Sequence, residues 1–216
     1  MRRLSLARIA GVAAACCAAA CGARAAEPDA LAQIGAQVGS HAVVRAEFTQ
    51  SRQMAVMKRP LTSSGRLVYA RRLGVLWLIE QPLRATYVLG EDRIAEVGAD
   101  GVRRERALRE VPGLAPLGRV LRALFGADTA VLKEHFEVTL RGDAAAWELD
   151  LRPREAQLAQ FLAGVQVSGG RFVEAIRMSE AGGDVTQIRF RNSRSASAPS
   201  DEELRLFGEA APATRP

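Results

Sequence analysis

Few residues of this chain have the types and spacing that bond chemistry requires. Its two histidines, His41 and His135, are far apart, and neither belongs to the closely spaced pattern by which histidines bind zinc. The sequence contains no G-x-S-x-G nucleophile elbow, no P-loop and no G-x-G-x-x-G turn. We therefore predict that both histidines lie at strand edges, and that the protein is not an enzyme and holds no cofactor or metal.

The acidic residues follow a structural pattern. Glu47, Glu148 and Asp150 alternate with apolar residues, which is typical of the solvated face of a strand. The sequence pattern does not reveal a pair of carboxylates that distant strands bring together. A periplasmic enzyme acting on lipid or cell-wall material therefore stays open as a minor alternative.

All three cysteines lie in the N-terminal segment, at Cys16, Cys17 and Cys21. This segment has a basic start, a short apolar stretch and the cleavage pattern Ala23-Arg24-Ala25, so residues 1–25 are predicted to be a secretory signal peptide. A chain cleaved there has no cysteine, and therefore no disulfide or thiol nucleophile. The predicted location is the periplasm.

A second form of export competes with simple cleavage. Ala18-Ala19-Ala20-Cys21 is a weak lipobox, which would make Cys21 a lipidated N-terminus. The protein would then be tethered to a membrane rather than free in the periplasm.

Removing the leader changes the charge balance. The leader contains four arginines and no acid, so 26 basic residues remain against 24 acidic ones. This near balance, without a block of like charges, argues against nucleic-acid binding. The remaining chain suits a single domain, which we place at 26–208 with a flexible tail at 209–216, and we expect a monomer.

Alternating apolar and polar residues dominate the chain. In the first strand Val44, Ala46 and Phe48 point to one side. About ten such strands, joined by Gly- or Pro-containing turns, predict one large antiparallel sheet that is curved or forms an open barrel. The other predicted strands are 65–70, 75–80, 85–89, 136–142, 147–153, 165–168, 171–179 and 185–192, with hairpin turns at 91–92 and 100–101.

Helices are predicted at four places. Residues 28–40 and 117–125 carry apolar stripes at helical spacing, and 154–162 is compatible with a brief helix. Ser200 to Glu203 forms a capping box that opens a short terminal helix.

The run Leu73 to Ile79 does not alternate, so we expect this strand to be covered on both faces. The helix at 117–125 is the available cover. Periodicity alone does not tell whether this helix completes an ordinary core or forms a lid over an apolar cavity that holds lipid.

Two motifs resemble the LolA family of lipoprotein carriers. Val44 to Gln50, with the sequence VRAEFTQ, is similar to a strand near the mature start of that family. Gly65, Arg71, Trp77 and Pro82 follow in the order and spacing of its next block. The resemblance implies a mainly β fold, a half-open antiparallel barrel whose helical lid covers a hydrophobic cavity. It also implies a periplasmic shuttle that takes acylated lipoproteins or lipids from an inner-membrane transporter to an outer-membrane acceptor.

The resemblance also implies roles for individual residues. Arg71 matches an arginine that bonds to the lid and controls its opening, whereas Val75 stands where the family has an aromatic residue that assists cargo loading. Arg72 replaces the usual proline, so a specialised cargo such as a glycolipid is an alternative, as is a membrane-tethered LolB-like acceptor lipidated at Cys21. The predicted cavity lining is Phe48, Leu67, Tyr69, Val75, Trp77, Ile79, Tyr87, Leu117, Leu121, Leu124, Phe125, Phe136 and Trp147.

Overall fold

The computed structural model describes residues 30–91, 93–98, 101–107, 110, 123–126 and 128–209. The predicted signal peptide and nearly all of the predicted tail lie outside these residues. Leu117 and Leu121 of the predicted lid helix also lie outside them. None of the helices in the described part of the chain has the length and apolar character that a membrane span needs.

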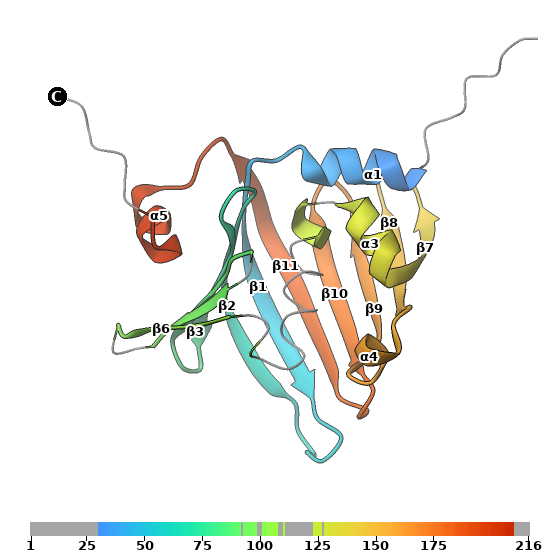
Figure 1. Ribbon diagram of the computed structural model, residues 1–216, viewed down its shortest axis with the longest axis horizontal. Coiled ribbons are helices and arrows are strands. Elements are labelled where there is room, and N and C mark those ends of the chain that lie inside the picture. The colour runs from blue at the N-terminus through green and yellow to red at the C-terminus, as the bar shows by residue number, and fades with distance from the viewer. Residues whose placement is uncertain are drawn as a thin grey trace, which may run out of the picture.

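An antiparallel sheet of eleven strands forms the body of the protein and curves strongly around one side (Figure 1). Its order is β6-β5-β4-β3-β2-β1-β11-β10-β9-β8-β7, so the first and last strands of the chain meet in the middle. This confirms the predicted mainly β fold with an open, curved antiparallel sheet. The strands are β1 (Val43–Gln53), β2 (Leu61–Ala70), β3 (Gly74–Gln81), β4 (Ala85–Leu89), β5 (Arg93–Val97), β6 (Arg103–Ala107), β7 (Phe136–Gly142), β8 (Trp147–Pro153), β9 (Leu162–Gly169), β10 (Val173–Glu180) and β11 (Val185–Ala196).

Gly65 shows why the motif needs a glycine at the middle of β2. It pairs with Phe48 on one side and with Ile79 on the other, beside a register shift between β2 and β3. A Cβ atom at this position would lie 1.9 Å from the carbonyl oxygen of Leu78. Any side chain would therefore push β3 away from β2, at the point where the sheet bends.

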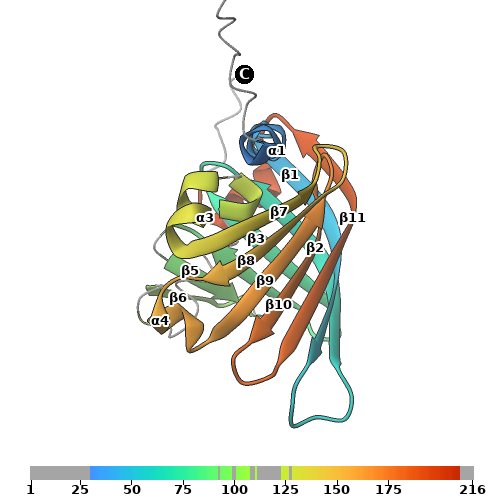
Figure 2. The same ribbon diagram turned by 90° about the vertical axis from the view of Figure 1, so that its right-hand side faces the viewer.

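Helices cover the concave side of the sheet (Figure 2). Helix α1 (Ala30–Gly39) lies across one end, and α3 (Thr129–His135) lies near the β7 edge (Figure 1). Between them is a short helical segment, residues 123–126, which is the described end of the predicted lid helix. The brief helix predicted at 154–162 is shorter than expected: α4 spans Ala156–Ala159, and Leu162 already begins β9.

The C-terminal helix α5 (Asp201–Phe207) lies on the opposite, outer face. Phe207 is buried there in a small cluster with Val68, Leu76 and Val88, and Leu206 packs beside it. Strand β3 is thus covered on both faces as expected. The cover of its outer face is α5, which the expectation based on the helix at 117–125 alone did not include.

Candidate functional site

The inner face of the sheet and its helices share one continuous cluster of buried apolar side chains, which we call the interior cluster. Every described residue of the predicted cavity lining either belongs to it or packs against it. The buried ones are Phe48, Leu67, Tyr69, Val75, Trp77, Leu124, Phe125, Phe136 and Trp147, and the partly buried ones are Ile79 and Tyr87.

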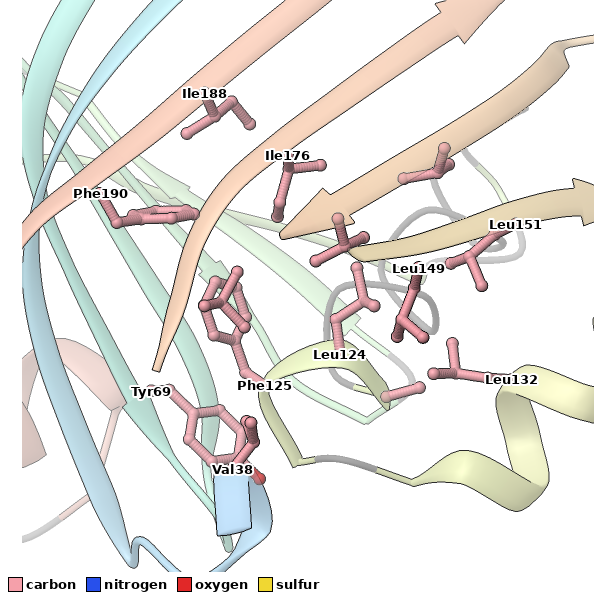
Figure 3. Close-up of a cluster of buried hydrophobic side chains, with 14 of the residues drawn as sticks. Val38, Tyr69, Leu124, Phe125, Leu132, Leu149, Leu151, Ile176, Ile188 and Phe190 are labelled. Carbon is pink, nitrogen blue, oxygen red and sulfur yellow. The ribbon is translucent and has the colours of Figure 1, made fainter. Parts of the chain in front are cut away.

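Side chains from the helical cover point toward the sheet. Figure 3 shows Leu124, Phe125 and Leu132 directed at apolar side chains of the strands. The Phe125 ring meets Phe190 of β11 edge-on, with centroids 5.5 Å apart, and lies 6.1 Å from the ring of Tyr69. The cover and the sheet therefore meet through apolar contact.

Aromatic rings occupy the middle of the interior cluster. Phe48 and Trp77, from β1 and β3, have centroids 4.2 Å apart, and Trp77 meets the edge of Phe190 at 6.2 Å. Because aromatic pairs prefer tilted and edge-on arrangements, these contacts fix the centre of the sheet's inner surface.

The second half of the sheet contributes residues that the sequence analysis did not assign to the site. The alternation of apolar and polar residues in the predicted strands already indicated that these side chains face inward. However, no motif assigned them to the lining of the predicted cavity. The inner-face residues concerned are Leu149, Leu151, Val165, Val167, Ile176, Ile188 and Phe190.

Arg71 lies in the turn between β2 and β3, at the C-terminal end of α1. Its guanidinium Nη2 donates to the carbonyl oxygen of Gly39 and, at 3.3 Å, to that of His41. Because the last carbonyls of a helix lack intrahelical partners and carry partial negative charge, a cation is favourable there. Arg71 thus holds the end of α1, one of the helices over the interior cluster.

A second polar contact holds the same helix from the other half of the sheet. The amide Nε2 of Gln37 donates to the carbonyl oxygens of Ala144 and Gly170, both at 2.9 Å. The indole Nε1 of Trp147 donates to the Gly170 oxygen as well, at 2.7 Å. The turns β7–β8 and β9–β10 are thereby attached to α1.

His41 lies beside Arg71, and its ring stacks on Phe172 with centroids 4.7 Å apart. Burial, followed by the charges of Arg171 and Arg71, lowers the pKa of His41. The imidazole is therefore neutral at neutral pH. His41 thus lies at the attachment of α1, where its backbone carbonyl accepts from Arg71.

The other histidine directly precedes Phe136, a buried residue of the interior cluster. His135 ends α3, and its Nδ1 lies 2.6 Å from a carboxylate oxygen of Glu155. Within the described ranges, no group of three or more His, Cys, Asp or Glu side chains is placed to hold a metal ion. In the same ranges, Thr186 is the one polar residue among the buried side chains. The interior cluster is suited to holding apolar groups.

Comparison with known families gives one match that spans most of the chain. The family described as "Outer membrane lipoprotein carrier protein LolA-like" matches residues 18–198. A comparison with curated protein sequences gave no match.

Solved structures of similar overall shape include three bacterial proteins. A LolA superfamily protein from Nitrosomonas europaea is 8% identical, with 81% of this chain and 94% of that chain covered and a TM-score of 0.46. A putative outer membrane lipoprotein-sorting protein domain from Vibrio parahaemolyticus is 10% identical, with coverages of 82% and 97% and a TM-score of 0.45. A DUF1329 family protein from Desulfovibrio piger is 13% identical, with coverages of 81% and 94% and a TM-score of 0.44.

Proposed function

Because this chain belongs to the family of LolA-like outer-membrane lipoprotein carrier proteins, we propose that it is a periplasmic carrier of acylated cargo. The acyl chains of a lipoprotein or another lipid enter the interior cluster, between the inner face of the sheet and its helical cover. The protein makes and breaks no bond, and the cargo leaves as it entered.

The observation that carries this proposal is the composition of the space between sheet and cover. It is lined by aliphatic and aromatic side chains from both halves of the sheet, and the helical segment 123–126 meets the sheet through apolar side chains. Burying a methylene group of lipid is worth about 0.8 kcal/mol of transfer free energy. An acyl chain is therefore stabilised in this interior when protein side chains move aside together with the cover.

Arg71 is the proposed latch of this cover. Its guanidinium lies at the exposed end of the helix, so its hydrogen bonds to the carbonyls of Gly39 and His41 can open and close while the apolar core stays packed. Opening at this end would expose the apolar residues that α1 contributes to the interior cluster, Leu31, Ile34 and Val38. Val75 of the same cluster replaces an aromatic ring of the family, and its smaller side chain would suit a different cargo headgroup or chain.

A carrier of this kind needs a donor and an acceptor. We propose an inner-membrane transporter as the donor and an outer-membrane protein as the acceptor, with the signal peptide at 1–25 directing the chain to the periplasm. Intact mass measurement of the exported protein distinguishes this from a membrane-tethered acceptor. A chain that starts at Ala26 and carries no acyl group supports the free carrier, whereas a lipid on Cys21 supports the acceptor.

The direct test is native mass spectrometry of the protein recovered from the periplasm of its own cells, followed by lipid identification. We expect a population that carries acylated molecules, released when the protein unfolds. Arg71→Leu should change the loaded fraction severalfold, whereas Arg72→Leu, at the exposed neighbouring position, should not. A protein without bound lipid that also fails to bind fluorescent fatty acids would exclude the carrier.

A further inference from the structure

The large apolar side chains that are exposed lie at one end of the sheet. In an antiparallel sheet every second turn lies at the same end, and α1 with the β2–β3 turn marks the opposite one. The turns β1–β2, β3–β4, β5–β6 and the β8–β9 connection therefore form one rim. The exposed large hydrophobic residues of the described chain all belong to this rim: Val56, Met57, Leu61, Leu83, Val102 and Phe161.

The β1–β2 turn extends farthest from the body of the protein (Figures 1 and 2). At its tip Val56 is 87% exposed, and in the β3–β4 turn Leu83 is 80% exposed. The base of the β1–β2 hairpin lies beside the β3–β4 turn, because Thr62 of β2 and Pro82 of that turn line the same surface cavity, of about 600 Å³. We call these two turns, residues 54–61 and 82–84, the apolar tip.

The charges of the apolar tip have one sign. Lys58, Arg59 and Arg84 are exposed and form no ion pair with any part of the chain that the structure describes, and neither turn contains an acidic residue. Carboxylates beside the tip have partners of their own: Arg52 binds Glu180 and Asp184 at 3.0 and 3.2 Å, and Asp184 also accepts from the backbone N–H of Ala55 at 2.9 Å. Glu80, just before the β3–β4 turn, is bound by Arg66 at 2.7 Å. The tip therefore presents apolar side chains together with three cations whose charge is not balanced within the tip.

We propose that the apolar tip docks on the surface of a membrane that contains anionic phospholipids. Val56, Met57 and Leu83 enter the boundary between headgroups and acyl chains, and the three cations bind lipid phosphates. A protein interface instead buries about 800 Å² on each side and is centred on anchors that fill pockets, often aromatic ones. The tip has no aromatic residue and is convex, which suits a bilayer surface better.

This docking does not depend on what the interior cluster holds. It would present one end of the half-open sheet to the membrane, while the α1 end with Arg71 faces away from it. Variants of the tip therefore leave the acyl-binding assay of the preceding section unchanged, so that each proposal can fail separately.

The test is flotation of the exported protein with vesicles of phosphatidylcholine alone or with one third phosphatidylglycerol. We expect binding to the anionic vesicles that weakens with salt. Replacing the tip cations by Lys58→Gln, Arg59→Gln and Arg84→Gln together should weaken it about a hundredfold, because each cation near an anionic surface contributes roughly fivefold. The control removes three exposed cations at the opposite end of the sheet and should reduce binding far less. They are Arg72→Gln and Arg171→Gln in turns and Arg141→Gln near the end of β7, where Arg141 lies 3.6 Å from Glu148.

Insertion itself is measured by tryptophan quenching. Val56→Trp should be quenched by phosphatidylcholine with brominated acyl chains mixed into the anionic vesicles, whereas Arg72→Trp should not, and the native Trp77 and Trp147 are buried and give the common background. Adding Met57→Ser and Leu83→Ser to the Val56→Trp reporter should weaken its quenching, and Val56→Ser with Leu83→Ser should lower the affinity at least tenfold. Binding that equals the wild type in the serine or glutamine variants, or no vesicle binding by the wild type, overturns the proposal and favours a protein partner for the tip.

Discussion

Helix α5 on the outer face and the segment 123–126 of the inner cover are attached in different ways. Helix α5 is held by directed polar contacts: Glu203 accepts from Arg45 at 2.5 and 2.6 Å, and Ser200 and Glu203 complete a capping box. Arg103 adds a hydrogen bond to the carbonyl oxygen of Leu206. On the inner face, the segment 123–126 contributes Leu124 and Phe125 to an apolar cluster.

This difference separates a fixed element from one that can move. Hydrogen bonds to charged groups depend on geometry, so the Arg45–Glu203 pair allows one position of α5. Although burial acts in the opposite direction, the hydrogen bonds from Arg45 and Ser200 keep the pKa of Glu203 below its usual range. Apolar contact is non-directional, so the contacts of Leu124 and Phe125 do not fix a single position of their segment.

The largest expected effect tests whether the inner face is a packed core in the free protein. Phe48 is 2% exposed and lies against Trp77, so Phe48→Ala should lower the free energy of unfolding by about 3–5 kcal/mol. Denaturant titration measures this loss. A loss below about 1 kcal/mol would mean that the site is already loosely packed.

The matched variant on the outer face is Leu76→Ala. Leu76 is fully buried under α5, and its loss should cost about 2–5 kcal/mol. Added fatty acid should stabilise Leu76→Ala as much as the wild type, because any ligand of the folded state does so, and should stabilise Phe48→Ala more by filling the space near the interior cluster. A stabilisation of Phe48→Ala no larger than that of Leu76→Ala would contradict the assignment of binding to the inner face.

A smaller effect is expected when the polar attachment of α5 is removed. Glu203→Ala leaves the partly buried guanidinium of Arg45 without its partner and breaks the capping box, which should cost about 2 kcal/mol. Asp201→Ala, in the same first turn but exposed, is the control and should cost less. A double-mutant cycle with Arg45→Ala isolates the pair, and a coupling energy near zero would show that this ion pair does not hold α5.

Most strands could be predicted because one face is buried and the other is exposed to solvent, which makes apolar and polar residues alternate. Val44, Ala46 and Phe48 lie on the inner face as their alternation predicts, and the capping box at Ser200 placed the start of α5 correctly. The face that α5 covers was not predictable. Apolar residues on both sides of β3 show that two covers are needed, but they do not tell which helix reaches which side.

The candidate site was predicted for the first half of the sheet, whereas in the second half only Phe136 and Trp147 were assigned to it. Motifs drew attention to Phe48, Gly65 and Trp77, whereas Ile176 and Ile188 stand in strands without any motif. Those strands join the site because β11 pairs with β1, although most of the sequence lies between the two strands. Local periodicity carries no information about such long-range pairing.

Gly126 offers a way to perturb the inner cover alone. A Cβ atom there would lie 2.8 Å from the hydroxyl oxygen of Tyr69, so Gly126→Ala should displace the cover and cost about 1–2 kcal/mol. Fatty-acid affinity should change with it, because the segment and Tyr69 both belong to the candidate site. Adding Tyr69→Phe removes the contacted oxygen and should relieve the strain, whereas an unchanged stability in the single variant would show that the cover yields freely.

The smallest expected effect concerns the α1 end and its response to pH. Because the pKa of His41 is lowered in the folded protein, by burial and then by Arg171 and Arg71, the unfolded chain takes up this proton first as the pH falls. The contribution of His41 to stability is therefore complete above about pH 6.5, declines as the pH falls below that value, and levels off below the folded pKa. Thermal unfolding between pH 7 and 5 should show this decline in the wild type and in His135→Gln, and a weaker one in His41→Gln. An imidazolium at His41 also repels Arg71, which bonds to the same end of α1. Acid should therefore loosen the proposed latch, while α5 stays in place. Identical pH profiles for His41→Gln and the wild type would show that His41 takes no part in this attachment.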